Sequence, residues 1–326
     1  MEKRGYRSLF WPIVLIGVGV IWLLGSMGVI PQANLNLLAS MWPLILIVIG
    51  LDLLIGRNSP VGGALVGLVA VAAVIFLLIA GPSLGMATSG TLKTKSLSAS
   101  IGEATSATIR MDFASEPVKM YALEDKTSLL KAEIDYYGTL QYSETGNPDR
   151  RISLSQQSSG AWSIPWNTTA SWDIGLSPNL PIDLTIDGAS GSASLDLSEL
   201  RLTSFAIDQG SGSLTLSLPA STQAYTADIV GGSGSLTLKL PENADLTIRL
   251  DGASGSINID VPDDAALQVE IRDAGSGSVN MPNWLDAVRV YNDNKEGQWE
   301  TAGFDSAEHQ LTIICDNLGS GSFNLK

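Results

Sequence analysis

The sequence GSGSLTLSLP, which begins at Gly210, decides the fold because the chain returns to it repeatedly. Related copies are GASGSASLDL at Gly188, GGSGSLTLKLP at Gly231, GASGSINIDVP at Gly252, AGSGSVNMP at Ala274 and GSGSFNLK at Gly319. The central glycines of the Ser-Gly-Ser units are spaced by 21, 22, 21, 22 and 44 residues. The last interval is two periods, which predicts one decayed copy around Trp299. A fixed period of this length indicates stacked structural repeats.

Each copy predicts a strand, a glycine turn and a second strand. After the turn at Gly212, the apolar residues Leu214, Leu216 and Leu218 alternate with polar ones, and the same alternation precedes the turn at Gly255. Because no such strand can bury its apolar face alone, successive copies must stack. The expected architecture is a β-solenoid of 21- to 22-residue coils, or a closely related sandwich. Its regular part is residues 181–326, and residues 88–180 are its irregular opening coils.

Residues 1–87 form a separate apolar part with only six charged residues. No charge occurs in the 44 residues between Arg7 and Asp52, nor in the 35 residues between Arg57 and Lys93. About 20 apolar residues suffice to cross a bilayer as a helix. The sequence therefore predicts an α-helical transmembrane region with three spans, at about 9–30, 37–55 and 61–84.

The basic residues of this part predict its orientation in the membrane. Lys3, Arg4 and Arg7 precede the first span, and Arg57 lies between the second and third. Because positive loops stay in the cytoplasm, we expect a cytoplasmic N-terminus. Three crossings then place the β part outside the cell membrane. If the second segment is re-entrant instead, two crossings leave the β part inside.

The charge of the remaining chain excludes several functions. Residues 88–326 carry 31 acidic and 15 basic residues, so this part has a net charge of −16. Such a surface is unsuited to nucleic acid, whose phosphates need clustered Lys and Arg. A single Cys and a single His exclude an internal disulfide and a zinc site built from several of these ligands. We therefore expect no enzyme activity and no cofactor.

Aspartates recur four residues before the central glycines and form a first candidate site. They are Asp187, Asp208, Asp251 and Asp273, with Val230 and Asn317 at the equivalent places in two other copies. One interpretation is that each side chain caps its own turn. The other is that a divalent cation bridges neighbouring carboxylates along the stack.

Two further groups of residues are candidate sites. Trp162, Trp166 and Trp172 cluster in a Ser- and Thr-rich stretch, where they either cap the stack or form an exposed patch that contacts sugar or lipid. Asp52 is the acid inside the predicted second span, and Arg57 follows five residues later. This pair is either an interfacial ion pair or a polar contact inside the membrane.

The chain also resembles a known bacterial family. WPIVLIGVGVIWLL from Trp11 and WPLILIVIGLDLLIGR from Trp42 resemble the LiaI/LiaF-like transmembrane region. WDIGLSPNLPIDLTIDGASGSASLDLSELRLTSFAIDQGSGSLTLSLP from Trp172 resembles the toastrack-type β-repeat domain of LiaF-like proteins. The end of the chain, QWETAGFDSAEHQLTIICDNLGSGSFNLK from Gln298, is similar to the closing strands of that domain. The third predicted span, directly before the repeats, departs from the family pattern.

The resemblance implies a non-enzymatic membrane protein of envelope-stress sensing that acts beside a histidine kinase. The first functional hypothesis is therefore a membrane-anchored sensor or scaffold that biases a partner protein. The alternative is a surface adhesin or a module that binds envelope glycans. An exposed tryptophan patch between residues 162 and 172 favours the alternative, and a buried one favours the scaffold.

Overall fold

The computed structural model describes residues 10–27, 42–54, 60–80, 92–113, 116–157, 170–188, 191–252 and 254–326. These residues fall into two units, one made of the helices before residue 81 and one made of the strands after residue 91.

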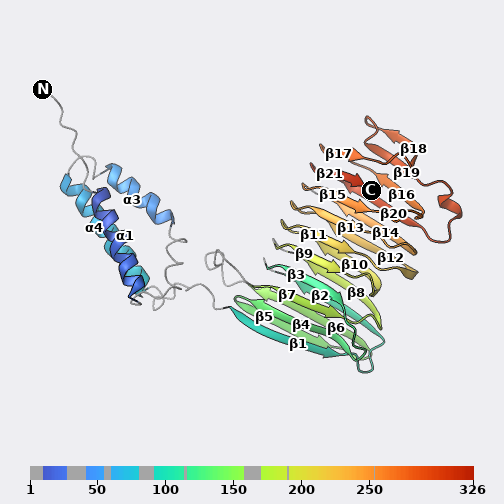
Figure 1. The fold of residues 1–326 in the computed structure, drawn as a ribbon, viewed down its shortest axis with the longest axis horizontal. Coiled ribbons are helices and arrows are strands. Elements are labelled where there is room, and N and C mark those ends of the chain that lie inside the picture. Colours follow the sequence, from blue (N-terminus) through green and yellow to red (C-terminus); the bar gives the residue numbers. More distant parts are fainter. Residues whose placement is uncertain are drawn as a thin grey trace. The chain divides into compact units, whose positions relative to one another are not determined.

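The first unit contains three helices among its described residues: α1 (Phe10–Ser26), α3 (Trp42–Leu54) and α4 (Pro60–Ala80) (Figure 1). Their 17, 13 and 21 residues correspond to about 26, 20 and 32 Å at the α-helical rise. One helix in the described chain, over Val61–Ala80, is therefore long and apolar enough to cross a membrane. The prediction of three full spans at 9–30, 37–55 and 61–84 is not supported for the first two. The described helices begin close to Pro12 and Pro43, because proline is tolerated only in the first turn of a helix.

Glycines let α1 and α4 pack closely. A Cβ atom on Gly17 would lie 2.4 Å from Cγ2 of Val71, and one on Gly67 would lie 3.3 Å from Cγ2 of Ile13. Small residues at such contacts allow helix backbones to approach in a membrane.

A leucine at position 17 is expected to separate these two helices. Gly17→Leu should weaken the helical unit by about 1–3 kcal/mol, because the Val71 side chain cannot move away without losing its packing. Gly19→Leu is the matched control, since no atom lies within 4 Å of its Cβ position. Unfolding in detergent mixtures with increasing SDS, followed by circular dichroism, measures both. An equal response of the two variants would contradict this packing.

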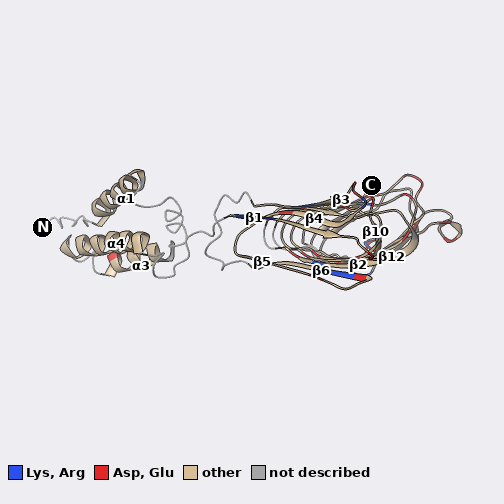
Figure 2. Cartoon of the chain, turned by 90° about the horizontal axis from the view of Figure 1, so that it is seen from below, with Lys and Arg blue, Asp and Glu red and all other residues tan. Residues whose placement is uncertain are grey.

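The second unit consists of two facing sheets, which appear as two layers in Figure 2. Among the described residues, the first sheet has ten strands in the order β1 (Lys93–Ser100), β4 (Ser128–Tyr136), β7 (Trp172–Leu176), β3 (Val118–Ala122), β9 (Ala193–Asp196), β11 (Leu214–Ser217), β13 (Leu236–Lys239), β15 (Ile257–Asp260), β21 (Ser322–Leu325) and β17 (Ser278–Asn280). The second sheet has eleven described strands in the order β18 (Asp286–Tyr291), β19 (Glu296–Glu300), β16 (Leu267–Ile271), β20 (Leu311–Asn317), β14 (Ala244–Asp251), β12 (Ser221–Val230), β10 (Arg201–Asp208), β8 (Pro181–Asp187), β2 (Ser106–Asp112), β6 (Asp149–Gln157) and β5 (Thr139–Thr145).

The central strands pair in parallel, each displaced from its neighbour by one repeat. Leu214 of β11 lies beside Leu236 of β13, which lies beside Ile257 of β15. This register places equivalent apolar residues in rows that face the interior, and all three are at least 95 % buried. The predicted all-β architecture of the C-terminal part is confirmed.

The stack does not follow chain order at its C-terminal end. β20 lies between β14 and β16, and β21 lies between β15 and β17. The residues around Trp299 form no parallel copy, so that prediction is wrong. They form an antiparallel hairpin of β18 and β19, in which Trp299 lies beside Val269 of β16 and covers the end of the core.

Antiparallel pairs also occur at the N-terminal end, where β4 pairs with β1 and β7 and β5 pairs with β6. A β-solenoid of successive coils is therefore not confirmed for the whole domain. Antiparallel hairpins at both ends give the terminal strands partners that a continued parallel stack would otherwise have to supply.

Candidate functional site

The Ser-Gly-Ser turns stack on one another through their backbones. A Cβ atom on Gly234 would lie 1.8 Å from the carbonyl oxygen of Gly212 in the preceding copy. At Gly255 and Gly277 the nearest backbone oxygen would lie at 2.0 and 1.9 Å. Only glycine permits so close an approach of neighbouring backbones. The repeated glycines therefore have a structural cause that needs no ligand.

Polar side chains beside these turns bond along the stack. Ser322 Oγ donates to Ser256 Oγ at 3.0 Å. Asn324 Nδ2 donates to Asn258 Oδ1 at 3.1 Å, and Asn280 Nδ2 donates to Asn324 Oδ1 at 2.6 Å. These ladders link three neighbouring strands of the first sheet and stabilise their register.

An open hollow of about 670 Å³ lies over the last copies of the turn. Its lining contains Lys295, whose Nζ donates to the carbonyl oxygen of Gly277 at 3.1 Å. The other lining residues are serines and glycines: Ser235, Ser254, Gly255, Ser256, Ser276, Gly277, Ser278, Ser320, Gly321 and Ser322. The hollow thus offers hydroxyl groups and one ammonium group on an otherwise acidic domain.

The acidic column lies on the surface of the second sheet. Asp208 is beside Asp187 on one side and Val230 on the other, and Val230 is beside Asp251. All four residues are exposed. The column is therefore interrupted by an apolar side chain in the middle of the stack.

Two members of the column cap their own turns. Asp273 Oδ1 accepts a hydrogen bond from the Gly275 N–H at 2.8 Å, and Asn317 Oδ1 accepts one from the Gly319 N–H at 2.6 Å. Among the described residues there is no group of three or more His, Cys, Asp or Glu placed to bind a metal ion. The cation ladder stays a prediction.

Asp112 is a further member of this column that the repeat period did not predict. Its strand places it directly beside Asp187. Partial burial raises the pKa of Asp112, and the neighbouring charge of Asp187 raises it further. The signal was present in ATIRMDF, where an alternating strand ends in an acid directly before Phe113.

The tryptophan cluster is not an exposed patch at Trp172. This side chain is 1 % exposed and meets Phe113 edge to face, with 5.2 Å between ring centroids. Trp162 and Trp166 lie outside the described residues. The described β unit instead exposes Trp284, Val288 and Tyr291, which lie in or beside the final hairpin and are 48–52 % exposed. These three residues lie outside the Ser-Gly-Ser repeats, so the repeat pattern did not predict their exposure.

Of the candidate pair Asp52 and Arg57 in the membrane part, the structure describes only Asp52. Asp52 lies half-buried in α3, whereas Arg57 lies outside the described residues, so their pairing stays a prediction. An apolar hollow of about 330 Å³ lies between α1, α3 and α4. Its lining residues are Phe10, Trp11, Val14, Val18, Ile21, Leu44, Ile45, Val48, Ile49, Ala70, Val71 and Val74.

Among the described residues, neither Cys315 nor His309 is hydrogen-bonded in a way that would form a nucleophile–base pair. Cys315 is fully buried between Leu250 and Ile271 of the neighbouring strands, and burial raises the pKa of its thiol. His309 Nδ1 lies 3.7 Å from Asp245 Oδ1. Cys315 thus acts as a small apolar core residue.

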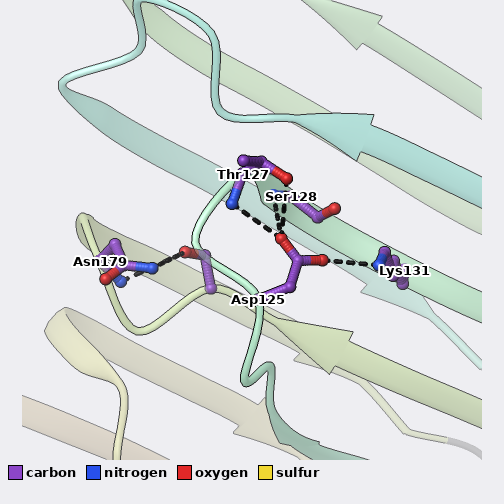
Figure 3. A network of polar contacts seen from close by, with 6 residues as sticks. Asp125, Thr127, Ser128, Lys131 and Asn179 are labelled. Carbon is purple, nitrogen blue, oxygen red and sulfur yellow. Dashed lines mark hydrogen bonds and ion pairs between the residues drawn. The ribbon is translucent and has the colours of Figure 1, made fainter.

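A polar network holds the turn between β3 and β4 (Figure 3). Asp125 Oδ1 accepts hydrogen bonds from the N–H groups of Thr127 and Ser128 at 2.7 and 2.8 Å, and Oδ2 lies 2.6 Å from Lys131 Nζ. Asn179 donates to Ser177 in the neighbouring turn. The Lys131 ammonium, followed by the two backbone donors, holds the pKa of Asp125 well below its usual range.

We expect Asp125→Asn to lower the melting temperature at pH 7 and to lower it by a smaller amount at about pH 2. The folded-state pKa is depressed, so the carboxylate stabilises the fold fully above the unfolded pKa of about 4, and this contribution shrinks as the pH falls from there towards the folded-state pKa. Thermal melts between these two pH values measure the difference. Glu124→Gln, at the exposed neighbouring position, is the control. A constant difference at every pH would contradict the role of the charge.

A membrane-anchored protein with an all-β repeat domain is the class that these helices and stacked sheets define. Residues 9–54 match the family model of the LiaI-LiaF-like transmembrane region. Residues 88–239 match the N-terminal domain of toast_rack, DUF2154, and residues 167–317 match Toastrack DUF4097. The chain belongs to the LiaF-like membrane proteins with a toastrack domain.

Two solved structures are similar to a part of the chain. A candidate cell adhesion protein from Clostridium sporogenes ATCC 15579 is 16 % identical with a TM-score of 0.48, over 72 % of this chain and 99 % of its own. A candidate adhesin from Bacteroides fragilis NCTC 9343 is 11 % identical with a TM-score of 0.30, over 72 % of this chain and 97 % of its own. No curated protein matches the chain in sequence. At these scores the two structures do not bear on the function.

Proposed function

We propose that the chain is a non-enzymatic sensor or scaffold of the bacterial cell envelope that transmits envelope stress to a partner protein in the membrane. The observation that carries this proposal is the interior of the β unit. One continuous cluster of buried apolar residues runs from Ala99 to Leu325 and joins both sheets. Such an interior makes the domain a stiff body, so a ligand bound anywhere on it can shift the whole body.

The β unit is proposed to lie on the outer face of the membrane. Basic residues before α1 and at Arg57 favour a cytoplasmic N-terminus, and an odd number of crossings then carries the chain out. Protease treatment of intact and lysed spheroplasts, with a C-terminal tag as the readout, tests this. Loss of the tag from intact spheroplasts agrees with the proposal. Protection of the tag until lysis would place the β unit in the cytoplasm and would contradict the sensing of a stimulus outside the membrane.

The partner is proposed to be a membrane histidine kinase. The expected result is that envelope stress changes phosphorylation of the kinase's response regulator in cells with this chain. The change should be lost when the chain is deleted and restored by the full-length chain. A response that is the same in all three strains would contradict a signalling role.

Adhesion is the second candidate, and one observation favours it. Trp284, Val288 and Tyr291 expose large apolar surfaces at the C-terminal end of the stack. Exposed aromatic rings of this kind stack on sugar rings. Binding of the full-length protein to purified peptidoglycan, compared with Trp284→Ala, tests this function. Equal retention of the two proteins on peptidoglycan would contradict a role of this surface in adhesion.

A further inference from the structure

A carboxylate replaces the glycine of the repeated turn at one place in the stack. Val118 pairs with Ala193, and Glu116 precedes Val118 by two residues as Gly191 precedes Ala193. The Glu116 side chain does not point to solvent, because only 8 % of the residue is exposed. This turn therefore places a charged group inside the stack where the other copies have no side chain.

The carboxylate of Glu116 is only partly satisfied by its surroundings. Its Oε1 accepts a hydrogen bond from Gln156 Nε2 at 2.9 Å, and the same nitrogen donates to the carbonyl oxygen of Tyr137 at 3.1 Å. The other carboxylate oxygen, Glu116 Oε2, is buried without a partner, and so is Gln156 Oε1. Two side chains joined by a hydrogen bond thus each retain one buried oxygen that accepts from no donor.

The charge of Glu116 has no paired cation in the part of the chain that the structure describes. The ion pairs among the described residues involve Asp125, Glu144, Glu270, Asp316 and Asp245, and none involves Glu116. A buried carboxylate without a cation costs several kcal/mol unless its charge is neutralised. A water molecule can donate to both free oxygens, but it cannot neutralise the charge.

We propose that Glu116 and Gln156 bind a divalent cation of the calcium type. Hard cations take carboxylate, amide and backbone carbonyl oxygens, and Glu116 Oε2, Gln156 Oε1 and the Tyr137 carbonyl supply these three kinds. Glu116 also lines a cavity of about 20 Å³, which has room for one water molecule on the side of Glu116 that faces Phe113 and Val118; Gln156 and Tyr137 do not line this cavity. The cation ties β6 to the turn between β2 and β3 and so closes the N-terminal end of the stack.

Calcium titration of the full-length protein in detergent tests this site. With Ca²⁺ raised to about 5 mM, we expect the melting temperature to rise by about 5 °C, and calorimetry to give one site per chain. Glu116→Gln should abolish both effects. Without calcium it should melt no lower than the natural protein, because its new amide N–H can donate to Gln156 Oε1.

Asp208→Asn is the control for binding to the acidic surface, since this aspartate belongs to the exposed column. It should keep the full response to calcium. The absence of any response in the natural protein would overturn the proposal, and so would a response that Glu116→Gln retains. If Glu116→Gln does not fold, Gln156→Met removes the amide oxygen, and an unchanged affinity in that variant would overturn the proposal equally. The site is independent of any signalling partner.

Discussion

Gly234→Ala is expected to destabilise the β unit by about 3–5 kcal/mol, although it adds a single methyl group. The new Cβ would lie 1.8 Å from the carbonyl oxygen and 2.4 Å from the carbonyl carbon of Gly212. Both atoms belong to the backbone of the neighbouring copy, so no side chain can rotate to make room. The strands on each side of the turn would have to separate. Denaturant unfolding of the full-length protein, followed by circular dichroism, measures the loss.

Gly252→Ala is the matched control for this prediction. Gly252 has a positive φ of 63°, and the nearest atom to its Cβ position is the Gly231 oxygen at 4.0 Å. Its substitution costs only the left-handed conformation, about 1–2 kcal/mol. If both variants lose the same stability, the close backbone contact at Gly234 is not the larger cost, and the prediction is wrong.

Trp172→Ala is expected to cost about 3–5 kcal/mol, since the indole is among the largest fully buried side chains of the described chain. The ring packs edge to face on Phe113, and β7 places its residue between Val118 and Ile134 of the adjacent strands. Its loss would leave a cavity where the N-terminal strands meet. Thermal and denaturant unfolding measure this effect.

Trp284→Ala separates a structural from a binding role of tryptophan. Trp284 is 48 % exposed, so its replacement should change stability by less than about 0.5 kcal/mol. If Trp172→Ala instead kept its stability and lost binding to an envelope glycan, Trp172 would have to be a ligand contact after all. Trp172→Phe is the conservative variant, and its smaller loss would identify packing as the cause, because the indole N–H has no hydrogen-bond partner.

The repeats and their buried faces were predictable because both depend on local pattern. Alternation at Leu214, Leu216 and Leu218 assigns one face of the strand to the interior whichever strand lies beside it. The apolar part at the N-terminus could also be predicted, because it lacks charged residues. The lengths of α1 and α3 could not be predicted, because a run without charges does not show where a helix begins.

Some features of the candidate sites could likewise be predicted from the sequence, and others could not. The positions of Asp187 and Asp208 in one column followed from the period, and the structure places them side by side. Burial of Trp172 could not be read from its Ser- and Thr-rich surroundings, since it depends on Phe113, which is far away in the sequence. The Glu116–Gln156 contact joins residues 40 positions apart and has no periodic signal.

The sequence by itself determined that this protein joins an apolar membrane part to stacked, acidic β-repeats, because composition and period record which residues avoid water. Only the tertiary structure decided which strands are neighbours. β20 enters the stack between β14 and β16, and the hairpin around Trp299 closes its end. Equivalent apolar rows fit any neighbouring copy almost equally well, so the choice among them depends on long-range packing at the two ends rather than on local pattern.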